Sequence, residues 1–136
     1  MKAICYISSF ANNLTKETIN NLIESVNKNN LSQRITGVLI IRNKHFFQVL
    51  EGESKKIDIL FKKIKNDNRH TGVITLLDSK IEGRIFDDYN SGNFEVFQKF
   101  HDLKKLYLYF NWINEANYLP ADKIVQLTTN FLKNST

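Results

Sequence analysis

The chain has 136 residues, 42% hydrophobic and 24% charged, and this composition favours one globular domain over a disordered segment. Its 19 Lys and Arg against 14 Asp and Glu give a net charge of +5, dispersed along the chain, which by itself indicates neither nucleic acid nor a phosphate-bearing ligand. The single cysteine, Cys5, excludes an internal disulfide and a multi-cysteine metal site, and it predicts a reducing, cytoplasmic location. We recognise no signal peptide, and no apolar run approaches the roughly 18 residues of a membrane span, so no membrane role is expected.

The chain begins with a predicted strand and helix. Residues 3–8 read as a strand that places Tyr6 on the same face as Ile4 and Ser8. Thr15 is the predicted N-cap of a helix, which we expect to end within residues 27–30, where asparagine tolerates a left-handed turn. The apolar stripe of this helix has i, i+3, i+4, i+7 spacing and consists of Ile19, Leu22, Ile23 and Val26.

A β-hairpin is predicted next. Residues 35–41 and 45–52 form two short apolar runs, each typical of a strand covered on both faces. In the second run Gln48 shares a face with Phe46 and Leu50, so its amide lies among large apolar groups. A buried amide left without partners costs about 1–3 kcal/mol, so a polar group should lie opposite Gln48. The alternative is a surface glutamine on an edge strand.

A second helix and two further strands complete the predicted sheet. The helix stripe consists of Ile57, Leu60, Phe61 and Ile64. A charged loop over residues 66–70 leads to a fourth strand over residues 73–77, and a fifth strand is predicted to begin at residues 84–86.

The element order predicts an α+β, ferredoxin-like βαββαββ sheet. Two right-handed crossovers should place the first and third strands side by side and parallel, with both helices on one face of the sheet. Tyr6 and Gln48 then become neighbours beneath the groove between the helices, where a flat, polar ligand is expected.

Residues 94–136 have a different character from residues 1–93, and we divide the chain there. Leu103, Leu106, Tyr107, Phe110 and Ile113 form one helical stripe, and a second helix is expected to begin near Pro120. This helical pair should cover the second face of the sheet, and its apolar surface predicts a homo-oligomer.

The usual catalytic motifs are absent, and the three histidines are isolated in the sequence, so no enzyme activity is predicted. Two other classes share the predicted topology. An RNA-binding module would use exposed aromatic residues on the third strand, yet the expected glycine is missing there and Glu51 would repel phosphate. An acylphosphatase-like enzyme would need a glycine-rich anion loop after the first strand, and residues 9–13 are not one.

Six collinear segments within residues 2–93 resemble BLUF domains, the blue-light sensors that use FAD. The segments are Tyr6, Asn30, Ile35-Thr36-Gly37, Phe47-Gln48-Val49-Leu50-Glu51-Gly52, Asp67-Asn68-Arg69-His70 and Arg84-Ile85-Phe86. The resemblance implies FAD as the cofactor, with its ring between the two helices. It also implies a short sensor whose C-terminal helices mediate assembly and bind a downstream signalling protein, with nucleic acid an unlikely partner.

The resemblance assigns roles to individual residues. Leu22 and Ile64 match the positions that sandwich the ring, Asn30 matches the side chain that binds its carbonyl edge, and Asn29 lies where a companion residue approaches the flavin. The ribityl-phosphate portion is expected at a charged group of residues at the groove mouth: Lys63, Asp67, Arg69 and His70. Simple surface exposure is the alternative for Arg69 and His70.

The resemblance also implies a mechanism. Under blue light Tyr6 would give an electron to the flavin, its proton would follow through Gln48, and the hydrogen bonds of Gln48 would rearrange, producing a small red shift. Many BLUF domains carry a Trp-x-Met-Gly segment on the fifth strand, where this chain has Tyr89-Asn90-Ser91-Gly92. Ser91 is therefore a candidate member of the switch, and the alternative is a solvent-facing serine in a slipped strand.

Overall fold

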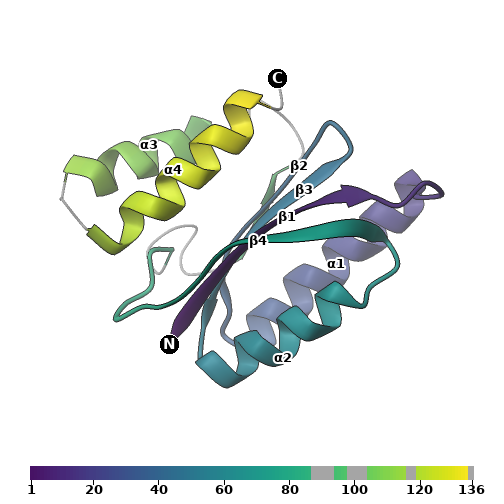
Figure 1. Cartoon of the computed structure of the whole chain (residues 1–136), viewed down its shortest axis with the longest axis horizontal. Coiled ribbons are helices and arrows are strands. Elements are labelled where there is room, and N and C mark those ends of the chain that lie inside the picture. Colours follow the sequence, from purple (N-terminus) through teal and green to yellow (C-terminus); the bar gives the residue numbers. More distant parts are fainter. Residues whose placement is uncertain (87–93, 98–103, 116–118, 135–136) are drawn as a thin grey trace.

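The computed structural model describes residues 1–86, 94–97, 104–115 and 119–134. The elements follow in the order β1 (Lys2–Phe10), α1 (Lys16–Ser32), β2 (Thr36–Arg42), β3 (His45–Gly52), α2 (Ser54–Lys65), β4 (His70–Lys80), β5 (Glu95–Phe97), α3 (Lys104–Glu115) and α4 (Leu119–Asn134). One sheet lies between two layers of helix, with α1 and α2 on one face and α3 and α4 on the other (Figure 1). The predicted α+β, ferredoxin-like class is confirmed.

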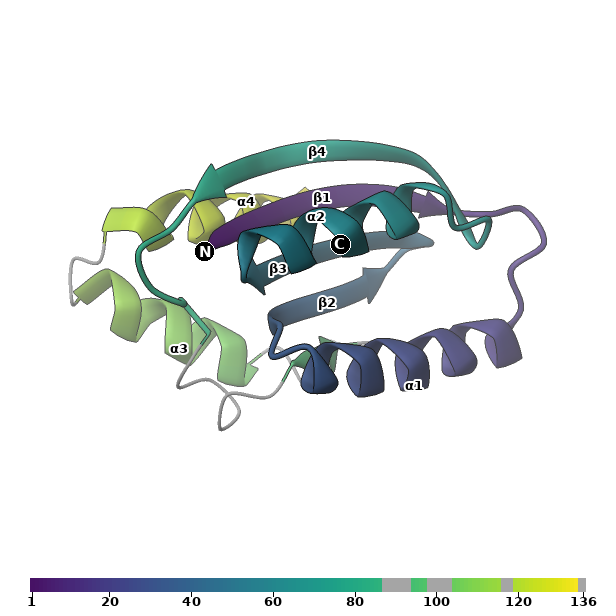
Figure 2. The ribbon, with the colours of Figure 1, turned by 90° about the horizontal axis from the view of Figure 1, so that it is seen from below.

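The strands lie in the order β4-β1-β3-β2-β5. Figure 2 shows the chain from below, with β1 and β3 adjacent in the middle of the sheet. Their adjacency is as predicted, but they are antiparallel, so the predicted parallel pairing is wrong. The crossover through α1 makes β2, not β3, run in the same direction as β1, and the tight β2–β3 hairpin then reverses the chain. The hairpin turns at Asn43 and Lys44, which have φ of 49° and 63°, as a two-residue turn requires.

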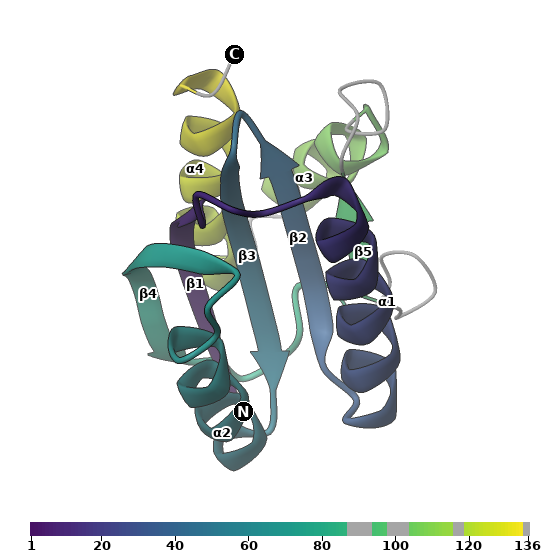
Figure 3. The same ribbon diagram turned by 90° about the vertical axis from the view of Figure 1, so that its right-hand side faces the viewer.

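The groove-side face of the sheet carries β-strand residues that alternate with those of the far face. Ile4, Leu39, Phe46 and Leu50 are buried there, against Ile57 and Phe61 of α2 and the apolar stripe of α1. Figure 3 shows α1 and α2 lying in front of the sheet with a space between their axes. The predicted helical stripes are confirmed, because Leu22 and Val26 of α1 and Leu60 and Ile64 of α2 pack on this cluster.

The far face is covered by the C-terminal helices. Phe47 and Val49 of β3 are buried against Leu106 and Phe110 of α3, and Phe47 stacks on Phe131 of α4 at 5.0 Å between ring centroids. Each face of the central strands therefore carries a layer of helices, as their nearly continuous apolar sequences predicted. This arrangement removes the RNA-binding alternative, which needed exposed aromatic residues on the third strand.

Two local predictions are wrong. Helix α1 continues to Ser32, and the left-handed residue is Arg34 with φ of 55°, so Asn29 and Asn30 lie within the last turns of the helix. Residues 84–86 do not begin a strand; the edge strand β5 is Glu95–Phe97, parallel to β2. The backbone N–H groups of Ile85 and Phe86 donate to the carboxylate of Glu51 instead of to a neighbouring strand.

The other edge of the sheet is formed by β4, which is longer than predicted. Its pairing with β1 is interrupted by register shifts between Cys5 and Tyr6 and between Ile7 and Ser9. Gly72, at φ of 63°, lies in the second irregular stretch. Among the described residues, no helix combines the length and apolar character that crossing a membrane demands.

Candidate functional site

A groove opens between α1 and α2 above the central strands. Its cavity volume is about 220 Å³, and it opens to solvent at its mouth. The floor comes from β1, β2 and β3, and the walls come from the two helices and the α2–β4 connection. The helices are splayed here because each packs its own stripe on the sheet and the space between them is not filled by side chains.

Tyr6 and Gln48 form the polar centre of the floor. They are directly opposite in the β1–β3 register, and the Tyr6 hydroxyl donates a hydrogen bond to Oε1 of Gln48. Both side chains are almost fully buried, at 4% and 3% exposed, so the alternative of a surface glutamine is wrong. Burial raises the pKa of the Tyr6 phenol, with the charge of Asp67 adding to the effect. Tyr6 is therefore neutral and acts as the donor in this pair.

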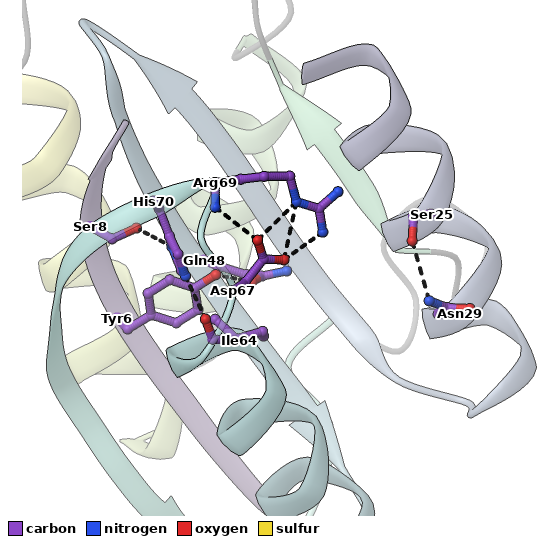
Figure 4. A network of polar contacts seen from close by, with 9 residues as sticks. All are labelled: Tyr6, Ser8, Ser25, Asn29, Gln48, Ile64, Asp67, Arg69 and His70. Atoms are coloured by element: carbon purple, nitrogen blue, oxygen red, sulfur yellow. Dashed lines mark hydrogen bonds and ion pairs between the residues drawn. The ribbon is translucent and has the colours of Figure 1, made fainter. Parts of the chain in front are cut away.

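His70 packs beside Tyr6 in a fixed orientation. Its Nε2 lies 2.5 Å from the carbonyl oxygen of Ile64, which can only accept, so Nε2 carries the proton. In the neutral ring Nδ1 then accepts from the Ser8 hydroxyl at 2.8 Å. The ring meets Tyr6 edge-on at 6.2 Å between centroids (Figure 4). This network fixes the start of β4 against the floor of the groove.

Asp67 and Arg69 form a charged pair at the groove mouth. Nη2 of Arg69 lies 2.5 Å from Oδ2 of Asp67, and Nε lies 3.0 Å from Oδ1. The hydrogen bond from Arg69 is the largest cause that holds the pKa of Asp67 below its usual range. Arg69 and His70 are half-buried and line the groove, so the alternative of simple surface exposure is not supported. Lys63 adds a second cation at this rim.

The α1 wall of the groove carries amide groups. Asn30 is buried, and its backbone carbonyl accepts from Ile35 at 2.8 Å, closing the helix end. Asn29 is exposed, and its Nδ2 donates to the hydroxyl of Ser25 at 3.4 Å. Figure 4 shows Ser25 and Asn29 across the groove from the Asp67–Arg69 pair.

The structure brings all ten predicted binding residues together around one groove. They are Tyr6, Leu22, Asn29, Asn30, Gln48, Lys63, Ile64, Asp67, Arg69 and His70. Their individual roles toward a ligand stay predictions. Ser91, the remaining candidate, lies outside the described residues.

Five further groove residues were not predicted: Ser25, Val26, Leu39, Phe46 and Leu60. Val26 and Leu60 belonged to the recognised apolar stripes, and their spacing could have placed them beside Leu22 and Ile64. Ser25 carries no such signal, because a serine on an amphipathic helix is ordinarily solvated.

The donor set fits a flavin. The two apolar walls suit the faces of a flat ring, the amides of Asn30 and Gln48 suit its polar edge, and Lys63 and Arg69 suit a phosphate at the mouth. Among the described residues no group of three or more His, Cys, Asp or Glu side chains could hold a metal ion.

Residues 1–92 match the family model described as "BLUF: Sensors of blue-light using FAD". The fold and this groove are therefore those of a flavin-dependent light sensor. The chain belongs to the BLUF family, whose domains bind flavin, and it is a BLUF blue-light sensor with the Tyr6–Gln48 hydrogen bond in place.

A curated relative is the "Blue light- and temperature-regulated antirepressor BluF" of Escherichia coli K12. It is 27% identical over 86 residues, which are 63% of this chain and 21% of the relative. The photoactivated adenylate cyclase subunit beta of Euglena gracilis is 38% identical over 56 residues, 41% of this chain and 6% of that protein. This chain therefore spans about a fifth or less of the length of these relatives.

Solved structures agree with the fold. A bacterial light-regulated adenylyl cyclase superposes with a TM-score of 0.65 at 30% identity, over 98% of this chain and 34% of that one. BlrP1 of Klebsiella pneumoniae superposes with a TM-score of 0.79 at 24% identity, over 97% of this chain and 34% of that one, and supports the fold alone.

Proposed function

We propose that this chain is a blue-light receptor in which Tyr6 is the electron and proton donor and Gln48 is the side chain that switches. The observation that carries the proposal is the buried hydrogen bond from the Tyr6 hydroxyl to the Gln48 carbonyl in the floor of the groove. The flavin, when bound and excited, supplies a strong electron acceptor. All other steps belong to the side chains of this protein.

The residues of the groove divide into three parts for holding FAD. Leu22 and Ile64, from facing helices, would contact the two faces of the ring, and Asn30 and Asn29 would bind its polar edge. At the mouth Lys63 supplies a point charge for phosphate, while Arg69 is already oriented by Asp67. His70, held by Ser8 and Ile64, forms the wall between this rim and Tyr6.

Tyr6 is prepared to lose an electron and a proton together. Its phenol is neutral, and its O–H bond already points at Oε1 of Gln48. Loss of an electron makes a phenol a far stronger acid, so the proton moves along the existing hydrogen bond to Gln48. The Gln48 amide then has a different set of donors and acceptors. After Tyr6 has regained its electron and proton, the Gln48 side chain is left rotated or tautomerised. The neighbouring ligand edge then receives a different hydrogen bond.

The first experiment separates binding from switching. Gln48→Leu should keep FAD, because the helix walls and the cationic rim remain, but it should lose the light-induced red shift. Tyr6→Phe should also lose the normal red shift, because it removes the hydroxyl that donates the proton to Gln48. Absorbance spectra before and after blue light measure both, and Gln126→Leu, at an exposed glutamine of α4, is the matched control. A colourless protein that takes up no FAD on refolding, or a Gln48→Leu variant that shifts like wild type, contradicts the proposal.

Signalling to another protein is the second half of the proposal. Support comes from the E. coli relative, whose name describes an antirepressor, and from the helical layer that α3 and α4 add to the sensor domain. Leu108 of α3 is 61% exposed, an apolar side chain available for self-association or a partner. Light-minus-dark pulldown identifies the partner, and scattering in both states measures assembly; a compact monomer in both states would contradict the oligomer.

A further inference from the structure

Glu51 carries a buried carboxylate that does not line the groove. It follows Gln48 by three residues on β3, so it points to the opposite face of the sheet, and it has 0% exposure. Three groups donate to its carboxylate: the hydroxyl of Thr36 at 2.7 Å, the N–H of Ile85 at 2.8 Å and the N–H of Phe86 at 2.7 Å. A buried carboxylate with three donors is a specific anchor for the backbone it binds.

Arg84 fastens the same segment a second time. Its Nη1 donates to the carbonyl of Arg34 at 2.6 Å, to the hydroxyl of Thr36 at 3.1 Å and to the carbonyl of Glu51 at 3.2 Å. Residues 84–86 are thereby tied to the start of β2 and the end of β3. These three residues are not part of a strand.

The other side of residues 84–86 contacts α3. The Tyr109 hydroxyl donates to the carbonyl of Ile85. The ring of Phe86 stacks on Tyr109 at 6.3 Å between centroids and meets Phe110 edge-on at 6.1 Å. The short segment therefore connects Glu51 of β3 with α3, which lies on the far face of the sheet from the groove (Figure 1).

We infer that Glu51 is a positioning residue that couples the switching strand to α3 by holding Ile85 and Phe86. The inference rests on the proposed function, because it concerns how a change at Gln48 reaches the far side of the sheet. A displacement of β3 moves the carboxylate, the carboxylate moves two backbone N–H groups, and these carry the Ile85 carbonyl that Tyr109 holds. No side chain in this route contacts the groove.

Glu51→Gln tests the carboxylate while keeping the shape of the side chain. An amide has one acceptor oxygen, and its NH₂ group would face an N–H donor, so Ile85 and Phe86 cannot both keep their acceptor. We expect their amide hydrogens to exchange about two- to tenfold faster in the dark. The FAD-loaded variant should keep the red shift but lose most of the light-induced change in exchange over residues 104–115. Hydrogen–deuterium exchange of the loaded full chain, in the dark and under blue light, measures all of these.

Glu82→Gln is the matched control, because Glu82 lies in the same connection and is exposed. It should behave like wild type in every measurement. Tyr109→Phe removes only the hydroxyl at the α3 end and should reproduce the loss of the light response in α3. This second variant decides the question if Glu51→Gln does not fold.

Three outcomes would overturn the inference. They are an unchanged α3 response in the Glu51→Gln or Tyr109→Phe variant, a wild-type protein that shifts red without any α3 response, and a red shift lost in Glu51→Gln, which would place Glu51 in the switch itself. Failure of the proposed function is distinguishable, because the wild type would then show no red shift at all. In that case the dark exchange rates of Ile85 and Phe86 still decide whether Glu51 anchors the segment.

Discussion

The two faces of one sheet differ in how they are filled. On the groove face α1 and α2 pack at the sides and leave a hollow whose floor holds the Tyr6–Gln48 pair. On the far face Phe47, Phe86 and Leu106 join a continuous apolar cluster under α3 and α4. The only carboxylate among the buried described residues, Glu51, is on this far side, and its oxygens are occupied by protein donors.

This difference teaches how one strand can serve two purposes. Successive residues of β3 point to opposite faces, so Gln48 is presented to the hollow while its neighbours Phe47 and Val49 hold the far layer. Substitutions on the two faces should therefore have different consequences.

The largest expected contrast is between the adjacent residues Phe47 and Phe46. Phe47→Ala removes a fully buried ring that stacks on Phe131, and it should lower the free energy of unfolding by about 3–5 kcal/mol. Phe46→Ala should cost at least about 1 kcal/mol less, because that ring borders the groove, and it should weaken flavin binding. Urea denaturation of both flavin-free variants checks the contrast; equal losses would show that the two faces are packed alike.

A smaller effect is expected at the groove wall. Asn30→Ala should weaken FAD binding by about two- to tenfold, since one amide hydrogen bond is worth roughly 0.5–1.5 kcal/mol. Asn111→Ala, at an exposed asparagine of α3 on the other face, is the control and should leave affinity unchanged. Titration of refolded protein with FAD measures both, and equal affinities for the two variants would remove Asn30 from the site.

A comparable effect is expected at Ser91. Phe86 is buried in the far cluster and Phe94 in the groove cluster, and Ser91 lies between them in the sequence. Ser91→Met should change the rate of dark recovery about two- to tenfold while leaving the size of the red shift nearly unchanged. Flash-induced absorbance decay of both proteins measures this, and identical recovery times would place Ser91 outside the switch.

The smallest expected effect is at the groove mouth. Arg69 holds the pKa of Asp67 below its usual value of 3.8, so this pair stabilises the fold above that pH and the contribution is lost as the pH falls through the lowered pKa. Asp67→Asn should therefore cost about 0.5 kcal/mol or less at pH 6, and the difference from wild type should shrink below about pH 4. Thermal unfolding at several pH values measures it, with Glu24→Gln on the exposed face of α1 as control. A difference that stays constant down to pH 3 would mean that the Asp67 charge is not its source.

Regular patterns in the sequence predicted most of the fold. The stripes of α1 and α2, the hairpin and the opposing faces of β3 follow from spacings of 3.6 and 2 residues, and they brought Tyr6 opposite Gln48. The predicted parallel pairing of β1 and β3 is wrong because the hairpin adds a chain reversal: β2 runs in the same direction as β1, so β3 runs antiparallel to it. The predicted end of α1 is wrong because the left-handed residue is Arg34. Arginine, unlike glycine or asparagine, does not indicate a left-handed turn in a sequence.

Residues 84–86 show what local patterns could not supply. Arg84-Ile85-Phe86 has the composition of a strand, but its N–H groups are bound by a side chain that is more than thirty residues away in the sequence. The pattern of alternation placed Glu51 on the far face without indicating that its carboxylate would find donors there. Partners of this kind are set by the tertiary structure.

The interrupted pairing of β4 has a consequence for the behaviour of the protein at high concentration. A long edge strand with free N–H and C=O groups invites a strand of another molecule, and extended aggregation can start there. The two register shifts against β1 and the left-handed Gly72 break the regular row of backbone groups along this edge. Nothing lies within 4 Å of a Cβ built at Gly72. Another residue there would therefore have room for its side chain, but its backbone would be strained by the positive φ. The irregular edge should thus keep strands of other molecules from pairing with β4. A variant in which β4 pairs regularly with β1 should precipitate more readily than the wild type.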